Sequence, residues 1–335
     1  MALPKALSTL TSKLSDLKIL VIGDLILDRY FWGTVERISP EAPVPVFDLK
    51  DITCSLGGSA NVASNLRGLR VNVSLMGVVG NDEKGKTLIE MAQSRGIDTK
   101  GIVLDPDRPT IIKTRIIAQS QQLLRIDKEE KKPLSPQIRS ALQEVYEDLL
   151  SEVHGIILSD YAKGVFLHEG FCSWLIQEAR RNNKFLMIDP KSSDWRKYQG
   201  ATTITPNAKE FKEVMRTEGL RESDFDEAAE YLIEKYSLDF LVVTLGKEGI
   251  YYYHPSQGGH HFPSQAKEVY DVSGAGDTVI ASLSAFYGIG FPLKEAVKLA
   301  NLCAGIVVGK IGTQPIYLEE LLNYLKLISE EEDHG

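Results

Sequence analysis

The sequence predicts an α/β protein with a mostly parallel central sheet and helices on both faces of that sheet. Short apolar runs recur along the chain, and segments with the apolar spacing of a helix lie between them. Alternation of strand and helix is typical of parallel sheets, whose strands are buried on both faces and are therefore almost continuously apolar. Two β-like stretches lack a following helix, and they predict a small second sheet.

The expected strands and helices follow one another in order. The first strand begins with KILVIGDLIL at Lys18 and ends at Asp28. Later strands share its short apolar character, and they span residues 71–80, 155–160, 184–190, 202–206 and 239–246. Helical spacing marks residues 59–69, 135–153, 168–181 and 223–236. Beyond residue 246 we expect an antiparallel edge, formed by YYYHP and HHF, and then three helices.

The two stretches without a following helix differ from the rest of the chain. Residues 29–56 contain three prolines and then alternate as VPVFDLK, and residues 110–127 read as two β-like pieces joined by the polar turn AQSQQ. We expect both to form a small separate sheet, inserted into the main domain as a lid. The expected division is 1–28, 57–101 and 128–335 for the α/β core, and 29–56 and 102–127 for the lid.

The composition excludes several classes of protein. The chain has 335 residues, with 38 Lys and Arg against 46 Asp and Glu, so its net charge is −8. Such an acidic balance argues against broad binding to nucleic acid or membrane surfaces, because that binding needs a positive field. The apolar runs are shorter than the ~20 residues that span a bilayer, and the N-terminal residues make a poor signal peptide.

The cysteines indicate a reducing compartment. Cys54, Cys172 and Cys303 are odd in number and show no CxxC spacing, which argues against a disulfide framework and against a cysteine-rich zinc site. The six histidines also lack the spacing of a metal site. We therefore expect a cytoplasmic location.

The segment DVSGAGDTVIASL, residues 271–283, is the strongest functional motif. Gly274, Ala275 and Gly276 have little or no side chain, and a helical pattern begins directly after them. Their backbone N–H groups can therefore converge at a helix N-terminus, which favours an anion. Asp277 lies in the first helical turn, where a carboxylate could accept the proton of a substrate hydroxyl. The alternative is a tight turn followed by an ordinary acidic residue.

A second glycine turn opens an earlier helix. In CSLGGSANVASNL, Gly57 and Gly58 allow close approach of the backbone, and Asn61 offers both a donor and an acceptor to a polyol. The alternative is a glycine turn with Asn61 facing solvent.

Two further segments fit a nucleotide site. In TPNAKEF, Asn207 and Glu210 make a plausible capping box, and the same two groups could hold water bound to Mg²⁺. In TLGKEG, Thr244, Gly246 and Gly249 lie at a strand end. They either form the floor of a nucleotide site or make a hairpin turn.

The octapeptide GNDEKGKT, residues 80–87, matches the phosphate-binding P-loop pattern. Its chemistry argues against that function, because Asp82 and Glu83 would place two carboxylates in a loop that must hold a polyanion. We expect an ordinary strand-to-helix turn here, with a P-loop nucleotidase centred on Lys86 as the alternative.

Taken together, LGGSANVA and DVSGAGDT resemble the two signatures of the ribokinase-like (PfkB) sugar kinase family. They stand in the family's order and far apart, GVVGNDEKGKTL is similar to a third family segment, and the resemblance covers nearly the whole chain. It implies a ribokinase-like fold and an ATP-dependent kinase that needs Mg²⁺. It also implies a monovalent cation, K⁺ in particular, near Asp271 and the GKIGT loop of residues 309–313.

Within this family the chain is most similar to kinases of D-glycero-β-D-manno-heptose 7-phosphate. The likeness implies phosphoryl transfer from ATP to the anomeric hydroxyl, giving heptose 1,7-bisphosphate for the nucleotide-activated heptose of lipopolysaccharide. Many such kinases are fused to a nucleotidyltransferase with an HxGH motif, which this sequence lacks. We therefore expect a single-activity kinase. The stretches that carry the likeness are residues 23–46, 113–127, 158–164, 189–195, 205–210 and 309–313.

The resemblance also implies roles for individual residues. Asp277 would be the catalytic base, and Gly274, Ala275 and Gly276 would form the anion hole. Mg²⁺ would be held through ATP and water, with no direct protein ligand. The residues implied at ATP and Mg²⁺ are Asn207, Ala208, Lys209, Glu210, Thr244, Gly246 and Gly249. Those implied at the sugar are Asp28, Gly57, Gly58 and Asn61.

The phosphate of the sugar needs cations in an otherwise acidic protein. Lys163 and Lys191 follow strand-like runs, and ligands of α/β sheets bind beyond the carboxyl ends of strands. Arg115 and Arg125 lie in the inserted sheet, which should close over the sugar. We expect some of these four side chains to bind the phosphate; the alternative is that they are surface lysines and cross-strand ion pairs.

Two other functions remain open from the sequence: a PfkB kinase of another sugar or a nucleoside, and a non-catalytic sugar-binding or scaffold protein of the same fold. The inserted strands would expose apolar side chains if left alone, so we expect lid-to-lid packing in a homodimer. These side chains are Val44, Val46, Phe47, Ile111, Ile112, Ile116 and Ile117.

Overall fold

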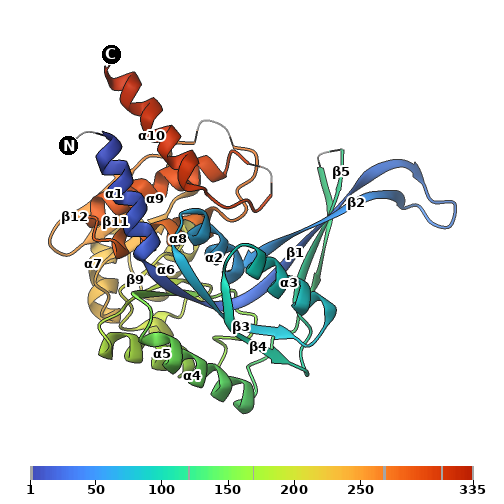
Figure 1. Cartoon of the computed structure of the whole chain (residues 1–335), viewed down its shortest axis with the longest axis horizontal. Coiled ribbons are helices and arrows are strands. Elements are labelled where there is room, and N and C mark those ends of the chain that lie inside the picture. Colours follow the sequence, from blue (N-terminus) through green and yellow to red (C-terminus); the bar gives the residue numbers. More distant parts are fainter. Residues whose placement is uncertain (1–2, 120, 169, 267–268, 311, 334–335) are drawn as a thin grey trace.

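The structure is a computed structural model that describes residues 3–119, 121–168, 170–266, 269–310 and 312–333 (Figure 1). Its main sheet runs in the order β4-β3-β1-β7-β8-β9, and all of these neighbours pair in parallel. The predicted α/β class is therefore confirmed. The strands are β1 (Lys18–Ile38), β3 (Asn72–Gly80), β4 (Asp98–Asp105), β7 (Gly155–Ser159), β8 (Phe185–Asp189) and β9 (Thr203–Ile204).

Helices cover both faces of this sheet. Successive residues of its strands point to opposite faces, so each strand contributes side chains to two apolar cores. In β1, Ile19 and Val21 pack into one apolar core, whereas Leu20 and Ile22 pack into the other. The first core is covered by α1 (Leu3–Asp16), α2 (Ser59–Gly68), α3 (Glu83–Ser94), α8 (Ala275–Gly288), α9 (Leu293–Val307) and α10 (Leu318–Asp333). The second is covered by α4 (Pro136–Leu150), α5 (Phe171–Arg181), α6 (Ala208–Thr217) and α7 (Phe225–Tyr236).

A small antiparallel sheet continues the main one. It contains β10 (Leu241–Thr244), β11 (Ile250–His254) and β12 (Gly258–Phe262), as the sequence predicts for YYYHP and HHF. A parallel bridge between Asn207 and Thr244 brings β10 beside the end of the main sheet. Within the described ranges, no helix is long and apolar enough to cross a membrane.

The lid is an arm of four strands that projects from the body (Figure 1). Its order is β2-β1-β5-β6, with β2 (Pro45–Gly58), β5 (Ile111–Ala118) and β6 (Gln121–Lys128). The expectation of a separate sheet is wrong, because β1 belongs to both sheets. It pairs with β3 up to Asp24 and with β2 from Leu25 onward, so one extended strand carries the chain from the core into the lid.

The second segment of the lid begins later in the chain than expected. Residues 102–105 pair with β3 as part of β4, so they belong to the main sheet rather than to the lid. Two of the side chains expected to need a partner surface, Ile111 and Ile112, are buried within this chain at the root of β5. Val44, however, is exposed near the tip, together with Ile38 and Leu49.

The parallel strands end at one edge, and this determines where a ligand can bind. Asp24, Asp189 and Thr205 lie at or just beyond the carboxyl ends of β1's core half, β8 and β9. Because ligands of such sheets bind beyond these ends, the functional site is expected between this edge, α8 and the root of the lid.

Candidate active site

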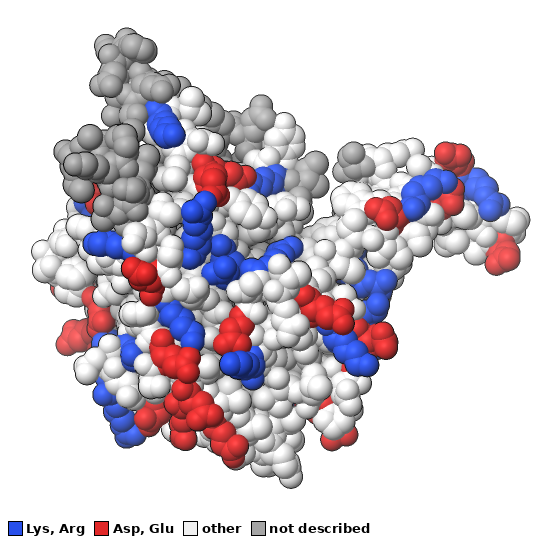
Figure 2. All heavy atoms as spheres, viewed as in Figure 1, with Lys and Arg blue, Asp and Glu red and all other residues white. Residues whose placement is uncertain are grey.

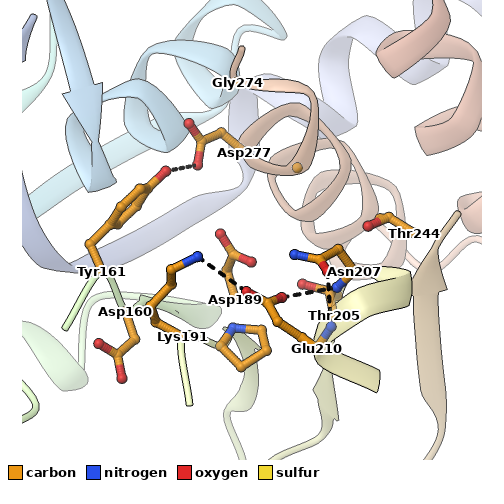
Figure 3. A pocket seen from close by; sticks show the side chains of 12 residues that line it. Asp160, Tyr161, Asp189, Lys191, Thr205, Asn207, Glu210, Thr244, Gly274 and Asp277 are labelled. Carbon is orange, nitrogen blue, oxygen red and sulfur yellow. Dashed lines mark hydrogen bonds and ion pairs between the residues drawn. The ribbon is translucent and has the colours of Figure 1, made fainter. Parts of the chain in front are cut away.

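A polar cavity of about 220 Å³ lies at this edge of the sheet (Figure 3). Its walls come from the loops after β7, β8 and β9, from the end of β10 and from the N-terminus of α8. Segments that are far apart in sequence therefore meet here. The lining residues are Asp160, Tyr161, Asp189, Pro190, Lys191, Thr205, Asn207, Glu210, Thr244, Gly274, Gly276 and Asp277.

Asp277 is buried in the first turn of α8 and faces this cavity. Its Oδ2 accepts a hydrogen bond of 2.7 Å from Asn61 Nδ2, and its Oδ1 accepts one of 2.8 Å from the hydroxyl of Tyr161. Burial raises the pKa of Asp277 to about 6, although both hydrogen bonds oppose this shift. A carboxylate poised near neutrality and fixed by two donors can accept a proton from a ligand hydroxyl.

The glycines before Asp277 allow α8 to begin at the cavity wall. Gly274 has φ +82°, and a Cβ there would lie 2.8 Å from Asn61 Nδ2, so a side chain is excluded. Ala275 N donates to the carbonyl of Val272 at 3.3 Å, so its amide has an acceptor within the chain. For Gly276 and Asp277, no acceptor of the amide is found in the part of the chain that the structure describes. The amide of Gly274 likewise has no acceptor among the described residues, so the amides left for an anion are those of Gly274, Gly276 and Asp277, and Ala275 is the one expected donor that is already paired.

Asn61 reaches Asp277 because α2 begins directly beneath β1. Gly58, the residue before α2, has φ +58°, and a Cβ there would lie 2.5 Å from the carbonyl of Asp24. A Cβ on Gly57 would lie 2.3 Å from Asp28 Oδ2. Asn61 is almost completely buried, so it does not face solvent, and its Oδ1 has no partner among the described residues. An acceptor thus remains available beside the base.

Tyr161 and Asp24 were missed by the sequence interpretation, which took only Lys163 from LSDYAKG. Asp24 is buried, and its carboxylate accepts the amides of Tyr161, Lys163 and Val165 at 3.1, 2.9 and 3.1 Å. These bonds fix the loop after β7 and direct Tyr161 toward Asp277. Asp24 could have been found from the sequence. A carboxylate at the end of a buried strand must accept hydrogen bonds from nearby groups, so it indicates that a neighbouring loop is held there.

Two more carboxylates face the cavity from its other side (Figure 3). Glu210 and Asn207 form the predicted capping box of α6, and Lys191 Nζ lies 3.3 Å from Glu210 Oε1. Burial, together with the charges of Asp277 and Glu210, raises the pKa of Asp189 well above its usual range. Oxygen donors with a surplus of negative charge fit a hydrated Mg²⁺. No group of three or more His, Cys, Asp or Glu able to hold a metal is found in the described ranges.

A larger and more apolar cavity of about 560 Å³ adjoins the first one. The two share Asn207, Thr244 and Gly276, so a ligand can extend from one into the other. Its apolar lining includes Ile250 and Val279. This pair of cavities suits a flat apolar group joined to a polyanion. The expected nucleotide residues Asn207, Ala208, Lys209, Thr244, Gly246 and Gly249 all line this cavity, and Glu210 lines the polar one.

The inner face of the lid carries cations close to Tyr161. The strand registers place Lys113 opposite Asp28, and Arg115 opposite Arg125. Arg115 Nη1 lies 2.6 Å from Asp28 Oδ1, and Lys113 Nζ lies 5.3 Å from the ring centre of Tyr161. Burial lowers the pKa of Lys113, as do the positive charges of Lys163, Arg115 and Arg125, against the attraction of Asp28. We call Lys113, Arg115, Arg125 and Lys163 the lid cations.

The lid cations differ from the expected set by one exchange, because Lys113 takes the place of Lys191. Lys113 was not singled out in the sequence, because only the pairing of β1 with β5 shows which lid residues face inward. Lys191 lies instead in the polar cavity with Glu210, because it follows β8 rather than the root of the lid. Ion pairs hold all three of the others: Arg115 with Asp28, Arg125 with Asp127 at 2.9 Å, and Lys163 with Glu129 at 2.6 Å.

The P-loop alternative is wrong. Asp82 occupies the N-terminus of α3 and accepts the amides of Lys84 and Gly85 at 3.0 and 2.8 Å. It also binds the amide and hydroxyl of Thr110. Its carboxylate therefore fills the place that a phosphate would take in a P-loop, and Lys86 is exposed.

Asp271 links two loops next to α8. Its Oδ1 accepts the amide of Ser273 at 2.8 Å, and its Oδ2 accepts the amide of Gly312 at 3.2 Å. Ile311 of the expected cation loop lies outside the described residues. Thr313 connects this loop to the lid through the hydroxyls of Ser55, at 2.8 Å, and Tyr30, at 3.2 Å.

Comparison with known proteins agrees with this arrangement. The pfkB family of carbohydrate kinases matches residues 16–320. The Bifunctional protein HldE of Helicobacter pylori (strain J99) is 46% identical over 304 residues, which cover 91% of this chain and 65% of that protein. The chain spans a little under two thirds of the length of the curated relatives it matches first.

Solved structures share the fold at low sequence identity. Phosphofructokinase-2 from Escherichia coli in complex with potassium superposes with a TM-score of 0.76 and 18% identity, covering 92% of this chain and 99% of that one. Ribokinase from Thermotoga maritima gives a TM-score of 0.71 and 22% identity, covering 92% and 99%. The expected ribokinase-like fold is therefore confirmed.

The raised pKa of Asp277 predicts how its removal changes stability. Because the folded-state pKa of about 6 lies above the ordinary value of 3.8, the native state binds more protons than the unfolded state between these pH values. The stability contributed by Asp277 is therefore lost as pH rises through this window. Asp277→Asn cannot ionise, so it should raise the free energy of unfolding at about pH 8 by up to about 3 kcal/mol and change it little near pH 4.

Denaturant unfolding at the two pH values measures this difference. Asp48→Asn, which removes an exposed lid carboxylate, is the matched control and should not raise the free energy of unfolding at pH 8. A gain from Asp277→Asn that is equal at both pH values would contradict the assigned direction of the shift.

Proposed function

The chain belongs to the pfkB family of carbohydrate kinases, and from this premise we propose that it transfers the γ-phosphoryl group of ATP to a hydroxyl of a phosphorylated sugar. The observation that carries the proposal is the convergence of Asp277 with the amides of Gly276 and Asp277 at the junction of two cavities. A non-catalytic scaffold has no need for a buried carboxylate poised near neutrality.

In the proposed reaction Asp277 accepts the proton of the attacking sugar hydroxyl. The hydroxyl oxygen forms a bond to the γ-phosphorus as the bond from that phosphorus to the β–γ bridging oxygen breaks, and ADP leaves with that oxygen. The two amides at the start of α8 stabilise the negative charge on the transferring group. Asn61 and Tyr161 hold the carboxylate in place, since each donates to one of its oxygens.

The nucleotide occupies both cavities in this proposal. Its base and ribose lie in the apolar cavity, and its phosphates extend past Thr244 and Asn207 toward Asp277. Mg²⁺, held by the phosphates and by water bound to Asp189, Glu210 and Asn207, would neutralise the polyanion among these carboxylates. Lys191 lies where it can contact the same phosphates.

We further propose that the acceptor is D-glycero-β-D-manno-heptose 7-phosphate and that its anomeric hydroxyl faces Asp277, as the similar stretches of sequence imply. The product would be the 1,7-bisphosphate, a precursor of lipopolysaccharide heptose. Asp28 and Asn61 lie where they can bind sugar hydroxyls, and the lid cations lie where they can bind the 7-phosphate. A kinase of another sugar phosphate would use the same cations, so a substrate panel must decide between them.

A K⁺ ion beside Asp271 and a cytoplasmic location complete the proposal. The related phosphofructokinase-2 was solved with potassium, and Asp271 ties together the two loops that would surround such an ion. The three cysteines are free thiols, as expected in a reducing compartment.

The lid also supports the proposal of a homodimer. On the face opposite the lid cations, Ile52, Leu124 and Ile126 are each between 43% and 53% exposed. The registers pair Ile52 with Phe31, Leu124 with Ile116 and Ile126 with Thr114, so all three belong to one outer face. A second copy of the same arm would cover this apolar face from water.

Replacing Asp277 tests the chemical step. Asp277→Asn should fold and bind ATP but lose about 10²–10⁴-fold in kcat, which corresponds to ~3–5 kcal/mol, because the general base is removed. An ADP-release assay with ATP, Mg²⁺ and a panel of heptose and hexose phosphates measures this loss. Near-normal turnover would remove Asp277 from the mechanism, and absence of ADP release with every sugar would favour the scaffold function.

Lys86→Ala is the matched control for this experiment. Lys86 lies in the P-loop-like octapeptide, but it is exposed and lines neither of the two cavities. Its removal should leave kcat within about twofold of the unchanged protein. A severe loss in this variant with a mild effect of Asp277→Asn would restore the P-loop function.

Replacing Lys113 tests the phosphate site. Lys113→Met should raise KM for the sugar phosphate by about 10–100-fold, since a charge-assisted hydrogen bond contributes ~1.5–3 kcal/mol, and should change KM for ATP little. The effect should be absent with the unphosphorylated sugar. Lys50→Met, on an exposed lid position, is the control. If removing the charge of all four lid cations leaves KM for the sugar phosphate unchanged, the lid does not bind that phosphate.

Charging the outer face of the lid tests the dimer. Leu124→Lys combined with Ile126→Lys should halve the mass measured by analytical ultracentrifugation, because two buried ammonium groups oppose packing of the arms. Leu327→Lys changes an equally exposed leucine on α10 and should leave the mass unaltered. A fully active monomer of the unchanged chain would refute lid-to-lid association.

A further inference from the structure

A cavity remote from the active site collects arginines in an otherwise acidic protein. It has a volume of about 300 Å³ and lies between the C-terminal end of α2, the end of α3 and the segment that leads into α10. Figure 2 shows basic side chains gathering over this region. Arg67, Arg70 and Arg95 line the cavity together with the carboxylate of Glu319, so three positive charges face one negative charge.

Two of these arginines are positioned without a carboxylate partner in the part of the chain that the structure describes. Arg67 donates to the carbonyls of Val71 and Arg95 at 2.7 and 3.4 Å, and Arg95 donates to the hydroxyl of Ser64 at 3.0 Å. Both are half-buried. Neutral acceptors hold each guanidinium in place but leave its charge uncompensated, and such planar forks match the geometry of a phosphate group.

The cavity also has a second, non-ionic wall. Pro315 and the exposed ring of Tyr317 line it beside Glu319. Glu319 forms an ion pair with Arg70 at the surface. An incoming dianion would displace this carboxylate from Arg70, and the remaining carbon skeleton of the ligand could lie against Tyr317. The chemistry therefore fits a small phosphate monoester better than a bare halide or a polyanion.

Both walls of the cavity connect to the catalytic base. Arg67 lies on α2, the helix that also carries Asn61, the donor to Asp277. The facing segment is packed against the same helix, because a Cβ on Gly68 would lie 1.9 Å from the carbonyl of Ile316. Asn65 Oδ1 accepts both the amide of Ile316 and the hydroxyl of Thr278 in α8, each at 3.0 Å.

From these contacts we propose that the cavity is an effector site for a small phosphate monoester, distinct from the catalytic phosphate sites. Binding changes how α2 is held against the segment before α10, and this changes how Asn61 holds Asp277. The effect on turnover is therefore not competitive with ATP or with the sugar. The site is independent of which sugar the kinase accepts.

Inorganic phosphate at constant ionic strength is the probe, and Tyr317→Trp provides a local fluorescent reporter. The reporter protein should give a saturable signal, and adding Arg95→Gln should weaken the apparent affinity at least about tenfold. Adding Lys191→Gln, which removes a cation of the active site, should leave the signal unchanged. An equal titration with and without Arg95, or dependence on Lys191, would overturn the site.

Two measurements on the chain without the reporter complete the test. Phosphate should raise the Tm of the unchanged protein more than that of Arg70→Gln or Arg95→Gln, since ligand binding to the native state stabilises it. Basal turnover of these variants should match the unchanged protein, while the non-competitive response to phosphate should be lost. Binding without any change in rate would overturn the effector role.

Discussion

The carboxylate of Asp277, buried between Asn61 and Tyr161, is the interaction on which the rest of the site depends. Removing a charged group from water costs several kcal/mol unless donors replace the lost solvent. These donors come from α2 and from the loop after β7, so the fold must bring both elements to the start of α8. Gly58 lets α2 begin under β1, and Asp24 fixes the loop that carries Tyr161.

A single strand links this carboxylate to the lid. β1 carries Asp24 in the core and Asp28 at the root of the lid, and Asp28 in turn holds Arg115. The lid cannot move at its root without bending β1 or breaking the bonds of Thr313 to Tyr30 and Ser55. The distance between the Asp277 carboxylate and the cations on the lid is therefore set by backbone geometry rather than by flexible linkers.

Much of the fold follows from the sequence because its signals are local. Apolar runs and helical spacing identify the main strands and most helices, and DVSGAGDT places Asp277 at a helix start. The sequence does not show which strands pair with one another, or in which register. The continuation of β1 into the lid and the inward direction of Lys113 depend on register between distant strands. The buried donors Asn61 and Tyr161 meet Asp277 only in the folded chain, so Tyr161 went unnoticed. Asp82 is a case in which local chemistry was enough. Its carboxylate in the octapeptide argues against a P-loop, and the structure places that carboxylate at the N-terminus of α3.

The distribution of charge explains how an acidic protein can handle several phosphates. Asp189, Glu210 and Asp277 face the polar cavity, and Lys191 is the cation that lines it among the described residues. A nucleotide polyanion cannot enter this field without a counterion, so under the proposed function these carboxylates would make nucleotide binding depend on Mg²⁺. On the lid, in contrast, cations outnumber their carboxylate partners, and a phosphate there needs no metal. In the proposed reaction, one region would bind phosphate through a metal and the other would bind it through arginine and lysine. This separation would keep the phosphate of the acceptor away from the metal bound to the donor.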